Sequence, residues 1–203
     1  DITVRVCSAS DIACDNPHAL GTTDADGAVS MDVIADEQRY LELEGPGIVP
    51  ATSWNNGPPK SDPFAEMIRV LSPETFMLVE NLVRTTGDPE RGHAGVQSND
   101  CNGLMGEGVV FTIDTADDAT VIAYFSEQGF PNPNFTETTK DGRAAVANLP
   151  AGPAVLTATI AATGQVIGSR SFYSRPATIA YPACVAADPD ARCGSARVAL
   201  LTA

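Results

Sequence analysis

Short stretches in which apolar and polar residues alternate recur along this chain. "ITVRVCS" (2–8) and "RYLELEG" (39–45) alternate with a period of two, which is typical of strands with one buried face. Similar strand-like stretches follow in the second half, at 108–114, 119–126, 153–161, 165–173, 177–183 and 196–202. Because turn residues separate neighbouring stretches at intervals of roughly 8–12 residues, the pattern predicts an antiparallel sandwich or barrel.

One segment has a helical period instead. "SPETFMLVENLVR" (72–84) places Ser72 at the N-cap position and Pro73 at the first helical position. Its apolar residues recur at helical spacing and share one face: Phe76, Val79, Leu82 and Val83. We expect this face to pack against a sheet.

These patterns divide the chain into three parts. We expect an all-β fold in which two antiparallel β-sandwich units are joined by a connector containing one α-helix. The first unit covers 1–58 and is the less complete of the two. The connector covers 59–91, and the second unit covers 92–203.

Two segments of the chain repeat one short pattern. "TTDADGAVSMDV" (22–33) and "TTKDGRAAVANLPAG" (138–152) each carry Thr-Thr, then Asp-Gly, then small and β-branched residues. Asp-Gly between such runs favours a hairpin, because glycine accepts the positive φ of the turn. The copies share the turn but not the first acid, so we expect Gly27 and Gly142 to matter most and Asp24 to be dispensable.

The repeated pattern and the continuation "NLPAGPAVLTATIAATG" (148–164) resemble the transthyretin-like β-sandwiches, which include the carboxypeptidase regulatory-like domains. The resemblance covers most of 92–203 and part of 1–58. It implies an accessory extracellular or periplasmic domain without an active site of its own. The tandem, cysteine-containing arrangement also resembles surface proteins of bacteria with large secretomes.

The charge balance excludes one class of partner. The formal net charge is −14 and the pI is near 4.3, so the chain lacks the basic clusters that nucleic acid requires. No apolar run is long enough to cross a bilayer. We expect a secreted, periplasmic or outer-surface monomer, with any signal peptide or lipid anchor outside this stretch.

The five cysteines indicate an oxidising compartment. Cys7 with Cys14, and Cys184 with Cys193, would each close a short loop, and neither spacing matches a zinc knuckle. We expect two disulfides, with free buried thiols as the alternative. Cys101 is left over, either free or competing for one of the other four.

Catalytic motifs are weak. "IGSRS" (167–171) lacks the second glycine of a nucleophile elbow, and His18 and His93 are far apart in sequence. The iron site of the related intradiol dioxygenases needs two tyrosines and two neighbouring histidines, which this chain does not offer. Glu42 and Glu44 fall on one face of a strand and are expected to be solvated. We therefore expect no enzyme and no required cofactor.

Calcium is one candidate ligand. Asp24 and Asp26, and then Asp117 and Asp118, place carboxylates in loops, where calcium finds oxygen ligands. The EF-hand spacing is not met, and Lys140 replaces an acid in the second copy of the repeated pattern. Ordinary turns are the competing interpretation.

Carbohydrate is the other candidate ligand. Trp54, Asn55 and Asn56 lie together in a loop-like stretch, and Phe130 and Phe135 lie in a second aromatic loop. Trp54 would otherwise fill a core edge or an interdomain contact. The sequence thus predicts a non-catalytic structural or interaction module whose partner is a protein or a surface glycan. The alternative is a module that binds carbohydrate or calcium.

Overall fold

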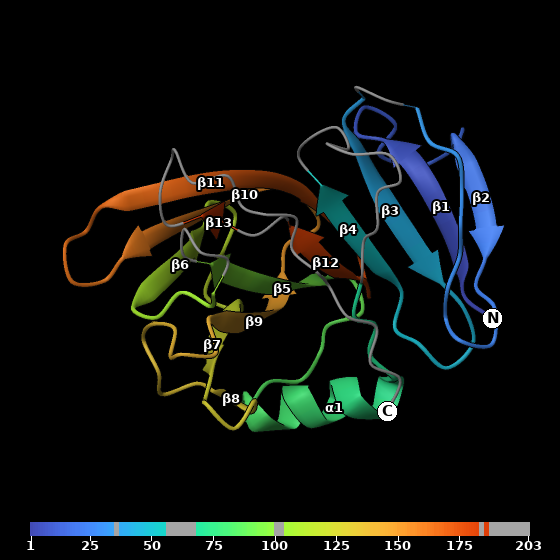
Figure 1. Cartoon of the computed structure of the whole chain (residues 1–203). Helices are drawn as coiled ribbons and strands as arrows, with labels where there is room; N and C mark the ends of the chain where they lie inside the picture. Colours follow the sequence, from blue (N-terminus) through green and yellow to red (C-terminus); the bar gives the residue numbers. More distant parts are fainter. Residues whose placement is uncertain (35–36, 56–67, 100–103, 183–184, 187–203) are drawn as a thin grey trace.

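The computed structural model describes residues 1–34, 37–55, 68–99, 104–182 and 185–186 (Figure 1). Strands dominate these residues, and the one helix among them is α1 (Pro73–Leu82). The first four strands are β1 (Thr3–Ser8), β2 (Ala19–Thr22), β3 (Arg39–Glu44) and β4 (Ala51–Asn55). The later strands are β5 (Gly92–Asn99), β6 (Val109–Ile113), β7 (Val121–Phe125), β8 (Pro131–Asn132), β9 (Arg143–Leu149), β10 (Gly152–Ile160), β11 (Val166–Ser174), β12 (Ile179–Pro182) and β13 (Val185–Ala186).

The strands form one large sheet and one small sheet. The ten-stranded sheet has the order β2-β1-β3-β4-β12-β5-β9-β7-β8, with β13 paired to β5, and the three-stranded sheet has the order β11-β10-β6. In Figure 1 the strands β1 to β4 stand on the right, and β10 and β11 lie over β5 and β9 on the left. The large sheet therefore runs through both parts of the chain.

The strand β12 joins these parts. Ile179 is in register with Ala51 of β4 on one side and with His93 of β5 on the other, and both pairings are parallel. The mostly-β class and the single helix are as expected, but a mixed sheet replaces the purely antiparallel one. Two separate sandwich units are not confirmed. The apolar pattern of β12 could not reveal this, because alternation does not encode pairing direction.

The main core lies between the small sheet and the left-hand part of the large sheet. Phe111 of β6 and Tyr124 of β7 stack with ring centroids 6.2 Å apart, and the Tyr124 hydroxyl accepts a hydrogen bond from the Phe111 N–H. Leu149 of β9 and Leu156 of β10 are fully buried in the same cluster. The two sheets thus pack face to face in this part of the molecule.

The helix covers the opposite face of the large sheet. Ser72 caps it by accepting a hydrogen bond from Thr75 N–H at 3.2 Å, as the sequence predicts. The Phe76 ring meets the edge of His93 with centroids 4.6 Å apart, and Val83 packs into a small cluster with Ala123 and Ala147. The expected apolar face therefore packs on the sheet, although its helical residues are only partly buried.

The two copies of the repeated pattern form turns but not complete hairpins. Gly27 donates to the Asp24 carbonyl and Gly142 donates to the Thr139 carbonyl, and both glycines have positive φ. No strand occurs within 23–34, where the chain instead packs Val29 close to Gly21 of β2. The strand after Gly142 is β9, which pairs with β5 and β7 rather than with a strand just before the turn.

Candidate functional site

A buried polar network lies where the end of β11 meets the first four strands. Arg175 directly follows β11, and its guanidinium Nη1 lies 2.7 Å from Glu42 Oε1 on β3. Its Nη2 donates to the Tyr40 hydroxyl at 2.7 Å and to the Ile12 carbonyl. The guanidinium also lies over the Tyr40 ring, 5.3 Å from the centroid. One cation therefore binds three groups from the first part of the chain.

Glu42 is buried, which corrects the expectation of a solvated carboxylate. Only 8% of the residue is exposed, whereas the Glu44 side chain keeps 44% exposure. Arg5 on β1 faces both acids, at 3.0 Å from Glu44 and 3.7 Å from Glu42. Because Arg175 and Arg5 supply two cations, the two carboxylates can share one face of β3 without net repulsion.

Trp54 lies in the core rather than in an exposed loop. It stands on β4, is 6% exposed and stacks on Tyr40 with ring centroids 4.3 Å apart. Its indole N–H donates to the Thr52 hydroxyl at 3.0 Å. This is the core-edge alternative of the sequence interpretation, and a sugar cannot stack on a ring so enclosed. Asn55 ends β4, and Asn56 lies outside the described residues.

Tyr40 is the polar centre of this network. Its hydroxyl contacts the carbonyls of Asp11 and Ile12 at 3.0 Å each. Burial raises the pKa of Tyr40 above its ordinary value, while the nearby Arg175 cation acts in the opposite direction. The hydroxyl therefore stays protonated and serves as a hydrogen-bonding link between Arg175 and the loop at 11–12.

The predicted disulfide between Cys7 and Cys14 is confirmed. The two Cα atoms are 5.3 Å apart, within the usual range for a disulfide, and both residues are buried. Glu42 Oε2 lies 3.9 Å from Cys7 Sγ, so the disulfide borders the network of Arg175. Cys101, Cys184 and Cys193 lie outside the described residues.

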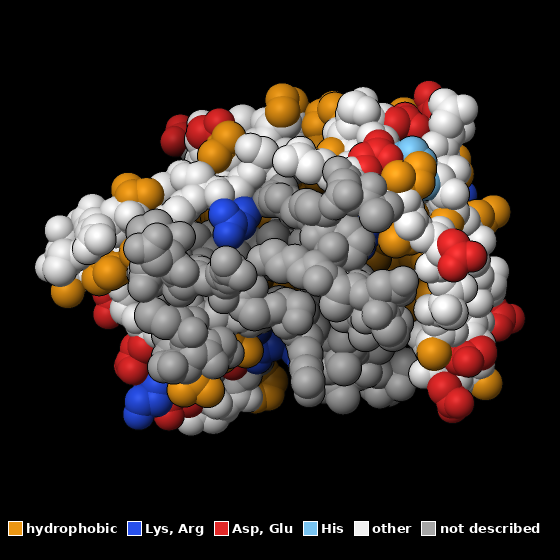
Figure 2. Space-filling model, turned by 45° about the horizontal axis from the view of Figure 1, so that its top comes forward, with side chains coloured by type: hydrophobic (Ala, Val, Ile, Leu, Met, Phe, Trp, Pro, Cys, Tyr) orange, Lys and Arg blue, Asp and Glu red, His pale blue; other side chains and the backbone are white. Residues whose placement is uncertain are grey.

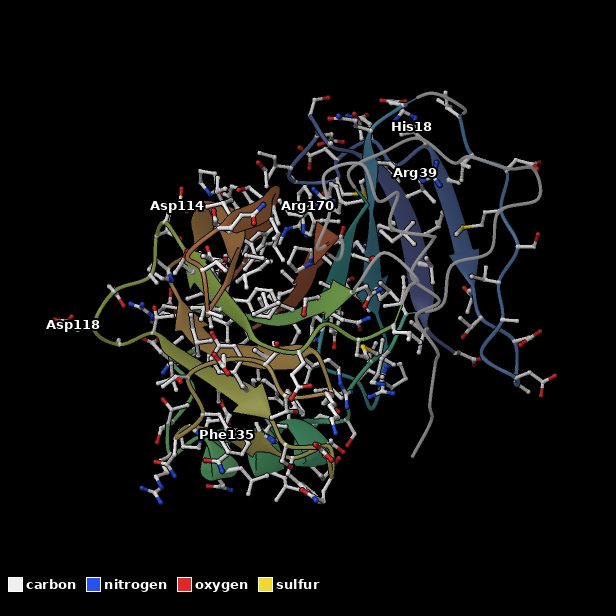
Figure 3. The ribbon with its side chains drawn as sticks, turned by 60° about the vertical axis from the view of Figure 1, so that its left-hand side comes forward. His18, Arg39, Asp114, Asp118, Phe135 and Arg170 are labelled. Carbon is white, nitrogen blue, oxygen red and sulfur yellow. A yellow bond between two sulfur atoms is a disulfide. The ribbon has the colours of Figure 1, made fainter. Side chains whose placement is uncertain are left out.

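The two histidines lie in different surroundings. His18 is partly exposed, with Nε2 3.3 Å from Glu37 Oε1 (Figure 3). His93 is buried beneath Phe76, and its Nδ1 has no hydrogen-bond partner among the described residues. Burial lowers the pKa of His93 to about 4, so its ring is neutral near neutral pH. Within the described part of the chain, neither histidine side chain is hydrogen-bonded to a serine, threonine or cysteine side chain.

The loop aspartates are engaged in turn formation. Asp24 Oδ1 accepts hydrogen bonds from the N–H groups of Asp26 and Ala28, both at 2.9 Å. The Asp24 carboxylate thus supplies two hydrogen bonds to the turn that contains Gly27, a role that the sequence interpretation did not give it. Asp26 itself is exposed.

In the second aspartate pair, the carboxylate of Asp117 is likewise occupied by hydrogen bonds. Asp117 Oδ1 lies 2.6 Å from Arg91 Nη2 and accepts from Ala119 N–H, and the hydrogen bond from Arg91 lowers the pKa of Asp117. Asp118 is exposed at the tip of its loop (Figure 3). The loops of Asp24 and Asp117 adjoin β2 and β7, towards opposite ends of the large sheet. The fold therefore does not bring the two aspartate pairs together.

Phe135 borders an open surface hollow of about 290 Å³. The hollow is lined by Glu107, Asn134, Phe135, Thr136, Glu137, Thr138 and Thr139. Phe135 is partly buried against the main core, whereas Phe130, before β8, is 56% exposed and does not line the hollow. Figure 3 places Phe135 on the side of the molecule that carries α1. One of the five expected ligand-binding residues thus lies at a hollow with polar walls.

No family model, curated protein or solved structure matches this chain. Among the described residues, no helix is long and apolar enough to cross a membrane.

The sequence interpretation missed Arg175 and Tyr40. Arg175 sits between two strand-like stretches, where an arginine is usually solvated, and Tyr40 belongs to an ordinary alternating run. The one available signal was that Glu42 lies between Leu41 and Leu43 on a strand. The strand that pairs with it carries a cation, Arg5. The partner of Glu42 could not be found, because Arg175 is separated from Glu42 by 133 positions.

Proposed function

We propose that this chain is a non-catalytic structural or interaction module, transthyretin-like in kind, that acts in secreted form or at a cell surface. The observation that carries the proposal is the use of the buried charges. Arg175 binds both Glu42 and Tyr40 at the join between the two parts of the sheet. Such an arrangement favours a rigid body over reactive chemistry.

The Cys7–Cys14 pair supports the proposed location. Disulfides persist in oxidising compartments and are rare in the cytosol, and this one is buried beside the polar network. Mass spectrometry of the chain isolated from its source, before and after reduction, tests this part. A fully reduced native chain would overturn the proposed compartment.

The acidic surface supports an interaction role. The net charge is −14, and Figure 2 shows acidic side chains at several places on one face with fewer lysines and arginines. A surface of one sign speeds association with partners of the opposite sign and makes it salt-dependent. We therefore propose a partner with a basic contact surface.

Activity-based probes for serine and cysteine hydrolases provide the sharpest test of the non-catalytic role. The full chain should remain unlabelled under conditions in which a control hydrolase reacts completely. Labelling of the native chain that is lost after heat denaturation would overturn the proposal. Binding of lysine-rich and glutamate-rich peptides of equal length, measured at low and high salt, tests the preferred charge of the partner.

The hollow at Phe135 supports carbohydrate binding as a second candidate function. It combines a partly buried aromatic ring with the polar side chains of Asn134, Thr136 and Glu137, which suit a small polyhydroxylated ligand. A glycan array with the parent chain and the Phe135→Ala variant tests this function. Phe130→Ala is the control, because Phe130 lies outside the hollow. Glycan signal that survives in Phe135→Ala, or no signal in the parent, would remove this candidate.

A further inference from the structure

The disulfide and its neighbouring carboxylate hold three metal-ligating atoms in one place. The two sulfurs of Cys7 and Cys14 and a carboxylate oxygen of Glu42 all lie within 4.8 Å of one another, and all three residues are buried. Among the described residues this is the one such group of histidine, cysteine, aspartate or glutamate side chains. We propose that the reduced chain binds one thiophilic divalent cation, such as Zn²⁺, through Cys7, Cys14 and Glu42.

The chemical step is a reduction followed by metal binding. A dithiol reductant gives two electrons and two protons to the Cys7–Cys14 bond, which breaks to two thiols while the reductant becomes a disulfide. The cation then displaces the two thiol protons into solvent and bonds to both thiolates and to the Glu42 carboxylate. Water completes the fourth position of a tetrahedral zinc site.

The two loop ends are held together even without the sulfur–sulfur bond. The carboxylate of Asp11 accepts hydrogen bonds from Asp15 N–H at 3.2 Å and from Asn16 N–H at 2.8 Å. The carbonyl of Asp11 accepts from Cys14 N–H and from the Tyr40 hydroxyl, each at 3.0 Å. These bonds fix the loop to β3, so Cys14 stays beside Cys7 after reduction.

The orientation of Glu42 suits a ligand role. Arg175 binds Oε1 at 2.7 Å, while the other oxygen, Oε2, lies 3.9 Å from Cys7 Sγ and 3.7 Å from Arg5 Nη1. Arg175 thereby fixes the carboxylate in the manner in which a neighbouring group usually orients a metal ligand.

The surrounding charge distinguishes the two redox states. In the disulfide state, the cations Arg175 and Arg5 are balanced by the carboxylates Glu42 and Glu44, so the group offers a metal cation neither a thiolate nor a net negative charge. Two thiolates formed with the incoming cation add as much negative charge as the cation adds positive charge. The net charge of the group is then the same as before reduction, and the two guanidiniums stabilise the anionic ligands.

The test uses the full chain with Cys101, Cys184 and Cys193 replaced by Ser, so that only Cys7 and Cys14 can supply thiolates. The chain is reduced, freed of reductant without oxygen and titrated with Cd²⁺ and with Zn²⁺. We expect one cation per chain and a thiolate-to-cadmium absorption band in the reduced form, and neither in the disulfide form. Equal binding by both forms, or no binding by the reduced form, would overturn the proposal.

Two further measurements identify the ligands. Glu42→Gln should weaken Zn²⁺ binding at least about tenfold, since even residues that only support a ligand change affinity by this factor. The matched control Glu44→Gln should bind like the parent, because Glu44 contacts Arg5 but lies outside the ligand group. Unchanged affinity in Glu42→Gln would sink the assignment.

X-ray absorption on the zinc-loaded parent avoids any dependence on how well a variant folds. Two sulfur neighbours at about 2.3 Å and oxygen neighbours at about 2.0–2.2 Å are expected. Four sulfurs, as would arise from two chains sharing one ion, or no sulfur at all, would contradict a site built from Cys7, Cys14 and Glu42.

Discussion

Arg175 and Glu42 form an ion pair of 2.7 Å although 133 positions of sequence separate them. The pair joins the residue that follows β11 to the middle of β3, and only 18% of the Arg175 side chain and 10% of the Glu42 side chain are exposed. Tyr40 and Ile12 receive the remaining hydrogen bonds of the guanidinium. The second part of the chain is therefore fixed to the first by side chains as well as by β12.

Replacing Arg175 by Ala should lower the free energy of unfolding by about 2–3 kcal/mol, because Glu42 would stay buried with only the more distant Arg5 beside it. Urea denaturation followed by Trp54 fluorescence measures the change, since Trp54 stacks on Tyr40 within the network. Arg170→Ala is the matched control: Arg170 donates at the surface to the adjacent Ser169 carbonyl, and its loss should change little. Equal effects of the two variants would contradict the role given to Arg175.

Asn148 should also be sensitive to substitution. It has a φ of 55°, and its side chain bonds to Asp88 N–H, the Thr85 hydroxyl and the Thr86 carbonyl, which ties the segment after α1 to β9. Asn148→Ala should cost about 2–3 kcal/mol of unfolding free energy, from lost hydrogen bonds and from backbone strain. Asn148→Gly loses the side-chain hydrogen bonds without adding backbone strain, because glycine accepts a positive φ. It should therefore cost about 1 kcal/mol less unfolding free energy than Asn148→Ala. Chemical denaturation of both variants separates the two contributions, and a Gly variant less stable than the Ala variant would refute this division.

The two turn glycines should differ in their tolerance of alanine. Both have positive φ, but an added Cβ at Gly142 would lie 2.9 Å from the Met105 Cβ and 2.9 Å from the Ser98 carbonyl. At Gly27 the same atom would meet nothing within 4 Å. Gly27→Ala should therefore cost about 1 kcal/mol, from the backbone alone. Gly142→Ala should cost about 1–3 kcal/mol more, because overpacking is added. Thermal unfolding of both variants tests the order, which equal shifts would contradict.

His93 should make the fold less stable in mild acid. Burial lowers its pKa to about 4 in the folded chain, whereas an unfolded histidine has a pKa near 6.5. As the pH falls below about 6.5, His93 binds a proton in the unfolded chain but stays neutral in the folded chain. The free energy of unfolding therefore decreases until the pH reaches about 4, where the folded chain also binds the proton. Between pH 7 and pH 5 this contribution amounts to about 2 kcal/mol.

Comparison of variants isolates the contribution of His93. His93→Phe removes the titrating group and keeps a ring beside Phe76, so the pH dependence of its unfolding should be flatter than that of the parent. Carboxylates titrate in both chains and cancel in the difference. His18→Gln serves as the control and should retain the dependence due to His93. A parent and a His93→Phe variant with parallel pH profiles would exclude His93 as the cause.

Local features of the fold could be predicted from the sequence where one residue pattern decides the structure. The caps Ser72 and Pro73 locate the start of α1, and alternation locates β1, β3, β6 and β10 within about two residues. The stretch of β5, "GHAGVQSN", was missed because it contains two glycines and its histidine faces the helix, so apolar alternation is weak. The predicted strand at 196–202 lies outside the described residues.

The candidate site was less predictable than the strands. The Cys7–Cys14 disulfide followed from spacing, since a short loop brings its ends together whatever the rest of the fold does. Tyr40 and Glu42 reach the disulfide through the pairing of β3 with β1, which places Tyr40 opposite Cys7. Arg175 comes from a distant position just before β12, so its meeting with Glu42 depends on the pairing of β12 between β4 and β5. Sequence patterns describe which face of a strand is buried, but they do not describe which strand becomes its neighbour.

The position of β12 also sets an order for the synthesis of this protein. The inner edge of β4 and the facing edge of β5 both wait for Ile179–Pro182, which is among the last described parts of the chain to leave the ribosome. Until then the first four strands present an unpaired edge, a template on which a second nascent chain can pair. The large sheet can thus be completed only once Ile179–Pro182 has been translated, and a truncation before Ile179 is expected to leave these edges of β4 and β5 unpaired.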